Sequence, residues 1–267
     1  MPRPSRRAAY ALLDDVYGRY HRVELMGIDP VSRVHRFSKP EDVEIAGLVA
    51  AALAYGRVAS VVNSVDKVLA ALGPSPYDTL KSFDRRRDGK RLAGFVHRFT
   101  TAEDMTDFLQ GVAHLVGEYG SVKNAFLAGD EAGATIDVPM AAFTARLREG
   151  IGKSRHANSY LWPTPGDGSA CKRYNLFLRW MARPDDGVDF GLWPEVGAHR
   201  LVMPLDVHVA RICRALGLLQ RKSNDWKAAC EVTAHLRKLC PEDPIRYDFA
   251  ITHIGITGRW KELLKTV

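Results

Sequence analysis

The stretch that decides the fold lies at residues 204–218 and reads PLDVHVARICRALGL. Asp206 follows an apolar pair and precedes apolar residues at helical spacing, and Gly217 ends the pattern. An aspartate in this position is typical of a helix N-cap, because its side chain accepts hydrogen bonds from the first backbone N–H groups. Glycine commonly ends a helix. The stretch therefore predicts an amphipathic helix that begins directly after Asp206.

A second stretch, at residues 169–181, reads SACKRYNLFLRWM and predicts another helix. Its apolar arc is centred on Tyr174, Phe177, Leu178 and Met181, and its polar side consists of Lys172, Asn175 and Arg179. Periodicity alone therefore favours a solvated position for Lys172, because lysine is seldom buried. Asp206, taken alone, is an ordinary N-cap.

Helical spacing of apolar residues continues through nearly the whole chain, and alternating, strand-like runs are scarce. Besides the two helices above, we expect helices over residues 5–20, 40–56, 59–72, 95–97, 102–119 and 140–148, one that begins at Ser223 or Asn224 and stops at Pro241, and one from Asp243-Pro244 to Gly255. Residues 84–91 predict a solvated charged connector, and residues 150–169 form the longest irregular segment. The sequence thus predicts an all-α protein.

Length and composition define the broad class of protein. With 267 residues, 46% hydrophobic and 26% charged, the chain has one or two globular domains and is neither a disordered nor a fibrous protein. The longest charge-free apolar stretch, residues 45–56, is too short to cross a bilayer. Asp14 and Asp15 interrupt the apolar run after the basic N-terminus, which argues against a secretory signal. We therefore expect a soluble cytoplasmic protein without a membrane partner.

The net charge and the cysteine positions indicate which classes of partner and cofactor the sequence favours. The net charge of +7 favours a polyanionic partner such as nucleic acid, although enzymes of phosphorylated metabolites are often equally basic. The four cysteines form no CxxC pair and the nine histidines include no HExxH, so the sequence shows no zinc or iron–sulfur signature. Reduced cysteines in a helical core are the expected state.

Taken together, the two quoted stretches resemble the helix-hairpin-helix DNA glycosylase superfamily, which includes endonuclease III and the 8-oxoguanine glycosylases. Residues 204–218 look like the aspartate-bearing helix of these enzymes, and residues 169–181 look like their lysine-bearing helix. The whole chain is also similar to an uncharacterised bacterial branch of the superfamily. The resemblance implies an all-α, two-lobed fold with a cleft between the lobes. Residues 41–183 would form a helical barrel lobe ending in the hairpin, and residues 1–40 and 184–267 the second lobe.

The function that this resemblance implies is excision of an oxidised base, such as 8-oxoguanine, by a DNA glycosylase with AP lyase activity. Lys172 would attack C1′ of the sugar to form a Schiff base, and Asp206 would stabilise the cationic sugar. Arg173 and the helix start near Lys172 disfavour the ammonium form, whereas backbone N–H groups at a helix start favour an ionised Asp206. The two groups are therefore chemically suited to these roles.

Further residues are nominated to bind DNA. The target base must leave the stack, and Tyr55 or Arg57 would fill the gap or contact the orphan base, unless Tyr55 simply packs at a helix end. Gly166 and Gly168, in an irregular hairpin, would offer backbone N–H groups to a phosphate, or carbonyls to a monovalent cation, unless they form a plain turn. Arg173 would also contact DNA.

The base pocket is nominated as Trp162, Asp248 and His253, although core packing is the alternative for the tryptophan. Asp189 receives no role. The four-cysteine cluster of endonuclease III is missing, so no iron–sulfur cluster and no other cofactor is implied. We expect a monomer that binds duplex DNA containing a damaged base. Two alternatives stay open: a non-catalytic nucleic-acid-binding protein on the same fold, and a helical enzyme acting on a phosphorylated or nucleoside metabolite.

Overall fold

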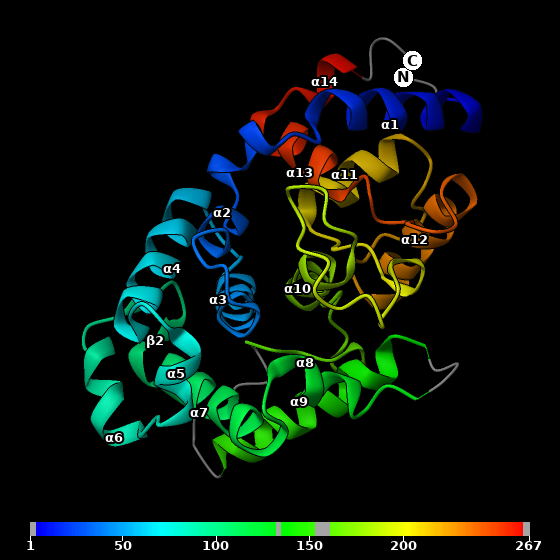
Figure 1. Ribbon diagram of the computed structural model, residues 1–267. Coiled ribbons are helices and arrows are strands. Elements are labelled where there is room, and N and C mark those ends of the chain that lie inside the picture. Colours follow the sequence, from blue (N-terminus) through cyan, green and yellow to red (C-terminus); the bar gives the residue numbers. More distant parts are fainter. Residues whose placement is uncertain (1–3, 132–134, 153–160, 264–267) are drawn as a thin grey trace. The chain divides into compact units, whose positions relative to one another are not determined.

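A computed structural model describes residues 4–131, 135–152 and 161–263, and almost all of its secondary structure is helical (Figure 1). The predicted all-α class is therefore confirmed. Residues 153–160, part of the segment expected to be irregular, lie outside the described residues. Over the described ranges, every helix is too short or too polar to cross a membrane.

The chain divides into two compact units, of which the first comprises residues 1–26 and 168–267. Its helices are α1 (Arg6–Tyr20), α10 (Lys172–Ala182), α11 (Val207–Ala215), α12 (Trp226–Leu239), α13 (Asp248–Thr257) and α14 (Trp260–Leu263), with a 3₁₀ turn at Ala198–Arg200. Helix α13 packs against both α1 and α11. The expected boundaries grouped the lysine-bearing helix with residues 41–183, whereas here α10 belongs with the C-terminal helices. Lys172 and Asp206 thus share one unit.

The second unit comprises residues 27–167. Its helices are α2 (Val31–Val34), α3 (Pro40–Ala52), α4 (Val58–Leu72), α5 (Pro76–Lys81), α6 (Arg85–Asp88), α7 (Ala102–Tyr119), α8 (Val122–Leu127) and α9 (Asp137–Ile151). Short 3₁₀ segments lie at Gly89–Leu92 and Pro165–Asp167, a third (Val23–Ile28) crosses the boundary between the units, and two strands, β1 (Val96–His97) and β2 (Thr100–Thr101), form a hairpin. Helix α7 packs along α9, and α3 contacts α4, α5 and α8.

Several helix ends lie where local sequence signals predict them. Ser5 caps α1 by accepting a hydrogen bond from the backbone N–H of Ala8 (3.2 Å). Pro40 occupies the first turn of α3, where its missing N–H costs nothing. Helix α4 ends at Gly73, whose φ of +79° is a conformation that glycine tolerates readily. These signals depend only on neighbouring residues, which explains why the sequence reveals them.

Other elements differ from the prediction. Residues 95–97, expected to be helical, contain strand β1, in which His97 pairs with Thr100. The run at residues 84–91 is not a purely solvated connector, because it forms α6 and buries the Asp88 carboxylate against Arg87 and Arg91. Helix α12 is capped by Asp225, just after the expected start, and α13 begins only at Asp248.

Candidate active site

Asp206 is held at the start of α11. Its Oδ1 atom accepts hydrogen bonds from the backbone N–H groups of His208 (2.8 Å) and Val209 (2.9 Å), which confirms the predicted N-cap. Its other oxygen, Oδ2, accepts no hydrogen bond from the described residues. The side chain is half-buried. The carboxylate is therefore fixed in place and keeps one oxygen for another group.

Lys172 is the first residue of α10 and is half-buried. It follows Cys171, a fully buried non-glycine residue with a φ of 51°, in the left-handed region that side chains disfavour. The Cys171 N–H donates to Ser169 Oγ (3.0 Å), and its carbonyl accepts the first helical hydrogen bond, from Asn175 (2.9 Å). The strained backbone of Cys171 is thus fixed by hydrogen bonds of both its N–H and its carbonyl, and it sets the direction of the chain at the start of α10, where Lys172 lies.

The polar side of α10 is buried below Lys172. Lys172, Asn175 and Arg179 lie on one helix face, because residues three, four and seven positions apart are neighbours on it. Asn175 and Arg179 are each only 1% exposed, so the expectation of a solvated polar side is wrong for these two residues. Asn175 Nδ2 donates to the Ala170 carbonyl (3.2 Å), and Asn175 Oδ1 is buried without a hydrogen-bond partner among the described residues. Buried polar groups without a protein partner are rare and often indicate a ligand or water site.

Arg179 joins α10 to α13 through buried ion pairs. Its Nη1 atom donates to Asp248 (2.6 Å), the first residue of α13, and its Nε atom donates to Asp189 (3.1 Å). Arg183 also pairs with Asp189, and with Asp243 (2.9 Å). Asp189, which had no role from sequence, is fully buried between the two arginines. Arg183, the C-cap residue of α10, follows Arg179 by four positions, and this spacing is the signal that could have revealed a shared acidic partner.

Asp186 connects these ion pairs to His21, at the end of α1. Asp186 forms an ion pair with Arg183 (3.1 Å) and lies 2.8 Å from His21 Nε2. Burial opposes ionisation of Asp186, but the His21 hydrogen bond and the Arg183 charge outweigh it and hold the pKa of Asp186 below its usual range. We call the group formed by His21, Arg179, Arg183 and the aspartates at 186, 189, 243 and 248 the charged cluster. Its four carboxylates outnumber its two guanidinium groups.

Asp248 is a member of the charged cluster whose pKa is raised. Burial raises the pKa of Asp248 to about 6, against the influence of Arg179. The charge of Asp206 raises this pKa further, and the charge of Lys172 lowers it. Two groups on different helices therefore lie near enough to act on one buried carboxyl. Lys172 and Asp206 thus both influence the pKa of Asp248, and all three residues belong to one unit.

Helices α11 and α13 approach closely beside Asp206. A Cβ atom at Gly255 would lie 2.8 Å from the Cβ of His208, so only glycine permits this contact. His208 Nδ1 is buried without a hydrogen-bond partner among the described residues. The histidine thus supports the α11 N-terminus through its backbone N–H and its packing on α13.

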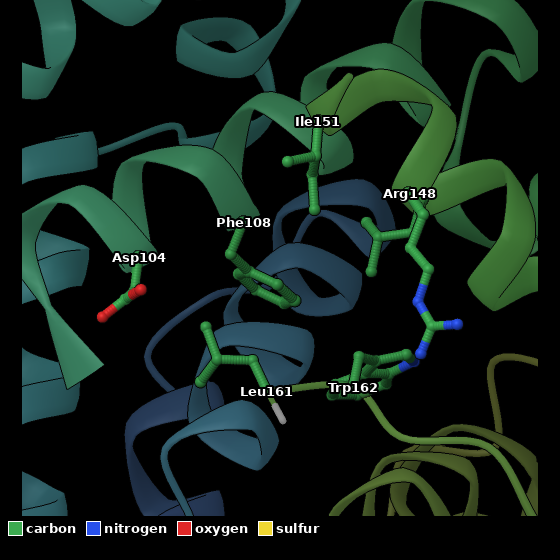
Figure 2. A pocket seen from close by; sticks show the side chains of 7 residues that line it. Asp104, Phe108, Arg148, Ile151, Leu161 and Trp162 are labelled. Carbon is green, nitrogen blue, oxygen red and sulfur yellow. The ribbon is translucent and has the colours of Figure 1, made fainter. Parts of the chain in front are cut away.

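The three nominated base-pocket residues do not gather in one unit. Trp162 belongs to residues 27–167 and is 2% exposed. It lines a small pocket of about 280 Å³, a volume that includes space open to solvent. Figure 2 shows the side chains of Phe108, Leu161 and Trp162 gathered there, and Leu147, Ile151, Arg148 and Asp104 complete the lining. Asp104 accepts from the N–H (2.7 Å) and hydroxyl of Thr101 and so caps α7. Most of the lining is apolar, and Asp104 and Arg148 are its two charged members.

Asp248 and His253 belong to α13 in the other unit. The Asp248 carboxylate is 1% exposed and paired with Arg179, so a base cannot reach it in this structure. The half-buried His253 ring stacks on Tyr20, with ring centres 5.7 Å apart. The arrangement assigns Asp248 to the charged cluster and His253 to the contact between α13 and α1.

The nominated DNA-binding residues lie in three places. Gly166 and Gly168 are exposed in the turn that contains Pro165–Asp167. Within this turn, hydrogen bonds from Thr164 hold the pKa of Asp167 below its usual range, and Asp167 also forms an ion pair with Arg148 (3.4 Å). Arg173 is half-buried beside Lys172. Tyr55 and Arg57 lie between α3 and α4, in the other unit, where Tyr55 is half-buried and Arg57 is exposed.

Among the described residues, no group of three or more His, Cys, Asp or Glu side chains is placed to hold a metal ion. All four cysteines are free thiols. The groups described at the candidate site are an amine, a fixed carboxylate and buried amide and imidazole groups.

The fold and the site define an all-helical protein with a lysine and an aspartate at two helix starts above a buried charged cluster. Residues 29–257 match the model of a family described as "Protein of unknown function (DUF2400)", and the chain belongs to this family. Searches of curated proteins and of solved structures find no match to the chain.

Proposed function

We propose that the protein is a DNA glycosylase with AP lyase activity that removes an oxidised, 8-oxoguanine-like base from duplex DNA. Its two units would then correspond to the two lobes of the helix-hairpin-helix glycosylase fold. The observation that carries the proposal is the buried polar face of α10: Lys172 stands at its open end, above Asn175 and Arg179, which the core encloses.

A buried polar face is costly unless it serves a purpose. The buried charge of Arg179 is compensated by two buried carboxylates. Replacing such ion pairs by apolar residues commonly leaves the free energy of unfolding unchanged or raises it. Asn175 Oδ1 and His208 Nδ1 add buried polar atoms without partners among the described residues. Groups of this kind concentrate at functional sites. The arrangement therefore favours a reaction site over a purely structural core.

The proposed reaction assigns separate tasks to the two groups. The bond between the sugar C1′ and the base breaks, and the electron pair leaves with the base. The Lys172 amine attacks C1′ and, after ring opening and loss of a proton, forms a Schiff base. Asp206, held by two backbone N–H groups, stabilises the positive charge that develops on the sugar with its oxygen Oδ2. Loss of a C2′ proton then expels the 3′ phosphate, and water releases the lysine.

The test is a cleavage assay on duplexes that each carry one oxidised base or an abasic site. The full-length protein should nick at least one duplex, and both Lys172→Ala and Asp206→Asn should lower the rate by roughly a hundredfold or more. Lys227→Ala is the matched control, because Lys227 is also in the first turn of a helix of the same unit and is exposed. Duplex binding without nicking would indicate a non-catalytic nucleic-acid-binding protein. The absence of salt-dependent duplex binding would favour an enzyme of small phosphorylated metabolites.

A further inference from the structure

The hairpin of β1 and β2 exposes an aromatic ring at its tip. The hairpin turn consists of Arg98 and Phe99, between the paired residues His97 and Thr100. Phe99 is 70% exposed, more than any other large hydrophobic residue in the described ranges. Arg98 has a φ of 54° and is, with Cys171, one of two described non-glycine residues with a positive φ. A strained backbone at a tight turn is often part of a functional contact, so the tip is a candidate for one.

The base of this hairpin is rigidly held, although its tip is exposed. His97 is 2% exposed, and its ring nitrogens lie 2.9 Å from Ser64 Oγ and 3.0 Å from the Tyr55 carbonyl. The Tyr55 hydroxyl donates to the His97 carbonyl (2.9 Å) and lies 2.7 Å from Thr100 Oγ1. Tyr55, one of the two candidates for filling the DNA stack, is therefore an anchor of the hairpin. The anchored base presents the Phe99 ring with little loss of conformational entropy on binding.

Two arginines accompany the ring. The Arg98 guanidinium lies 5.4 Å from the centre of the Phe99 ring. Its aliphatic part passes over Gly56, where a Cβ atom would come within 2.8 Å of Arg98 Cδ. Arg57 follows Gly56 and is exposed, and neither arginine forms an ion pair with a described residue. The tip thus combines one aromatic face with two uncompensated positive charges.

We propose that the tip formed by Arg57, Arg98 and Phe99 binds DNA, with the Phe99 ring stacked against a base beside an unstacked nucleotide. This inference rests on the proposed function and adds a DNA contact outside the Lys172 site. A single aromatic side chain stacks on any base, and neighbouring arginines neutralise the flanking phosphates. Apolar side chains also insert between base steps where the duplex is kinked. One exposed ring flanked by charge fits this chemistry better than a protein partner, which needs a broader apolar patch.

The experiment uses the full-length protein and a duplex containing a tetrahydrofuran abasic analogue, with fluorescent 2-aminopurine as its neighbour. Binding of the wild-type protein should change the 2-aminopurine fluorescence. The Phe99→Ala variant should bind about tenfold or more weakly and lose most of the fluorescence change, and Phe99→Trp should restore both. Arg57→Gln and Arg98→Gln should each lower the slope of log affinity against log salt by about 1. Val96→Ala is the control, because Val96 is 62% exposed on the same hairpin but lies outside the turn.

Unchanged affinity and fluorescence in Phe99→Ala, with a thermal unfolding profile like that of the wild type, would overturn the inference while leaving the Lys172 reaction untouched. A change of oligomeric state in Phe99→Ala, with DNA binding unaffected, would assign the tip to a second copy of the chain and also overturn it. Loss of the fluorescence change in Phe99→Ala, together with a wild-type protein that nicks no duplex, would support this DNA contact and reject only the catalytic proposal. A wild-type protein that binds no duplex would reject both.

Discussion

Helices α3 and α10 are both buried over most of their length, but they bury polar groups in different ways. In α3, Asp42 accepts a hydrogen bond from the backbone N–H of Tyr77 (2.8 Å), and Glu44 accepts one from the backbone N–H of Lys123 (3.1 Å). These carboxylates cap the starts of neighbouring helices. In α10, Arg179 instead pairs with two buried carboxylates. Buried charge that satisfies backbone groups is therefore structural, whereas buried charge paired with other buried charges suggests a site.

The largest expected effect is on stability, from removing the central cation of the charged cluster. Arg179→Met should lower the free energy of unfolding by roughly 3–5 kcal/mol, because Asp189 and Asp248 would be left buried without this partner. Urea unfolding measures the change. The control Arg36→Met removes a 53% exposed arginine from its pair with Asp66 and should cost about 0–1 kcal/mol. Equal losses in the two variants would show that the cluster is no more important than a surface pair.

The second effect concerns pH. Because burial raises the pKa of Asp248 from an ordinary value of 3.8 to about 6, its contribution to stability is full below about pH 4 and is lost as the pH rises through 6. Asp248→Asn removes this titration. The difference in unfolding free energy between wild type and variant should therefore change by up to about 3 kcal/mol between pH 4 and 7.

The control for this measurement has the opposite sign. Hydrogen bonds from Arg221, Ser223 and the Ala228 N–H lower the pKa of Asp225, so its contribution is present at neutral pH and is lost as the pH falls below 4. Urea unfolding of Asp225→Asn across the same pH range measures it. Parallel stability curves for wild type and Asp248→Asn would contradict the buried titration of Asp248.

A smaller effect is expected where α11 meets α13. Gly255→Ala would press a methyl group against His208 and should cost about 1–3 kcal/mol through overpacking, and it should slow cleavage by displacing Asp206. Gly117→Ala, in α7, is the matched control, because its new Cβ meets nothing within 4 Å and alanine should stabilise the helix by about 0.5–1 kcal/mol. Thermal unfolding and the nicking rate check both. A fully active and equally stable Gly255→Ala variant would contradict the close contact.

The smallest effect should come from α3. Asp42→Asn keeps an oxygen that can accept from Tyr77 and Ser75, so only the charge-assisted part of these hydrogen bonds is lost, at about 1 kcal/mol. Urea unfolding measures the change, and the nicking rate should equal that of the wild type. A loss as large as that of Arg179→Met would remove the distinction between the two helices.

The sequence predicted those features that depend on neighbouring residues. The N-cap at Asp206 and the end of the helix expected over residues 59–72 depend on local signals, and the structure confirms both. It also nominated Lys172 and Asp206, through the resemblance to the DNA glycosylases, and their catalytic roles stay a prediction.

What the sequence could not predict depends on distant residues. Arg179 is buried against Asp248 of α13, which follows much later in the chain, whereas the helical spacing of Asn175 and Arg179 alone indicated a solvated face. Similarly, His97 is extended because Ser64 and Tyr55 bind its ring, so no local pattern indicates the hairpin. In the first case tertiary contacts bury a face that the local pattern indicated as solvated, and in the second they replace an expected helix by a hairpin.

The central claim is that the Lys172 amine is the group that forms a covalent bond with the sugar. The most direct measurement is reduction with borohydride during the reaction on a damaged or abasic duplex, followed by peptide mapping of the adduct by mass spectrometry. The account predicts one DNA-modified peptide, modified at Lys172, and no adduct in Lys172→Ala, whereas Lys227→Ala should give the wild-type adduct. An adduct at another lysine, or one that persists in Lys172→Ala, would contradict the account.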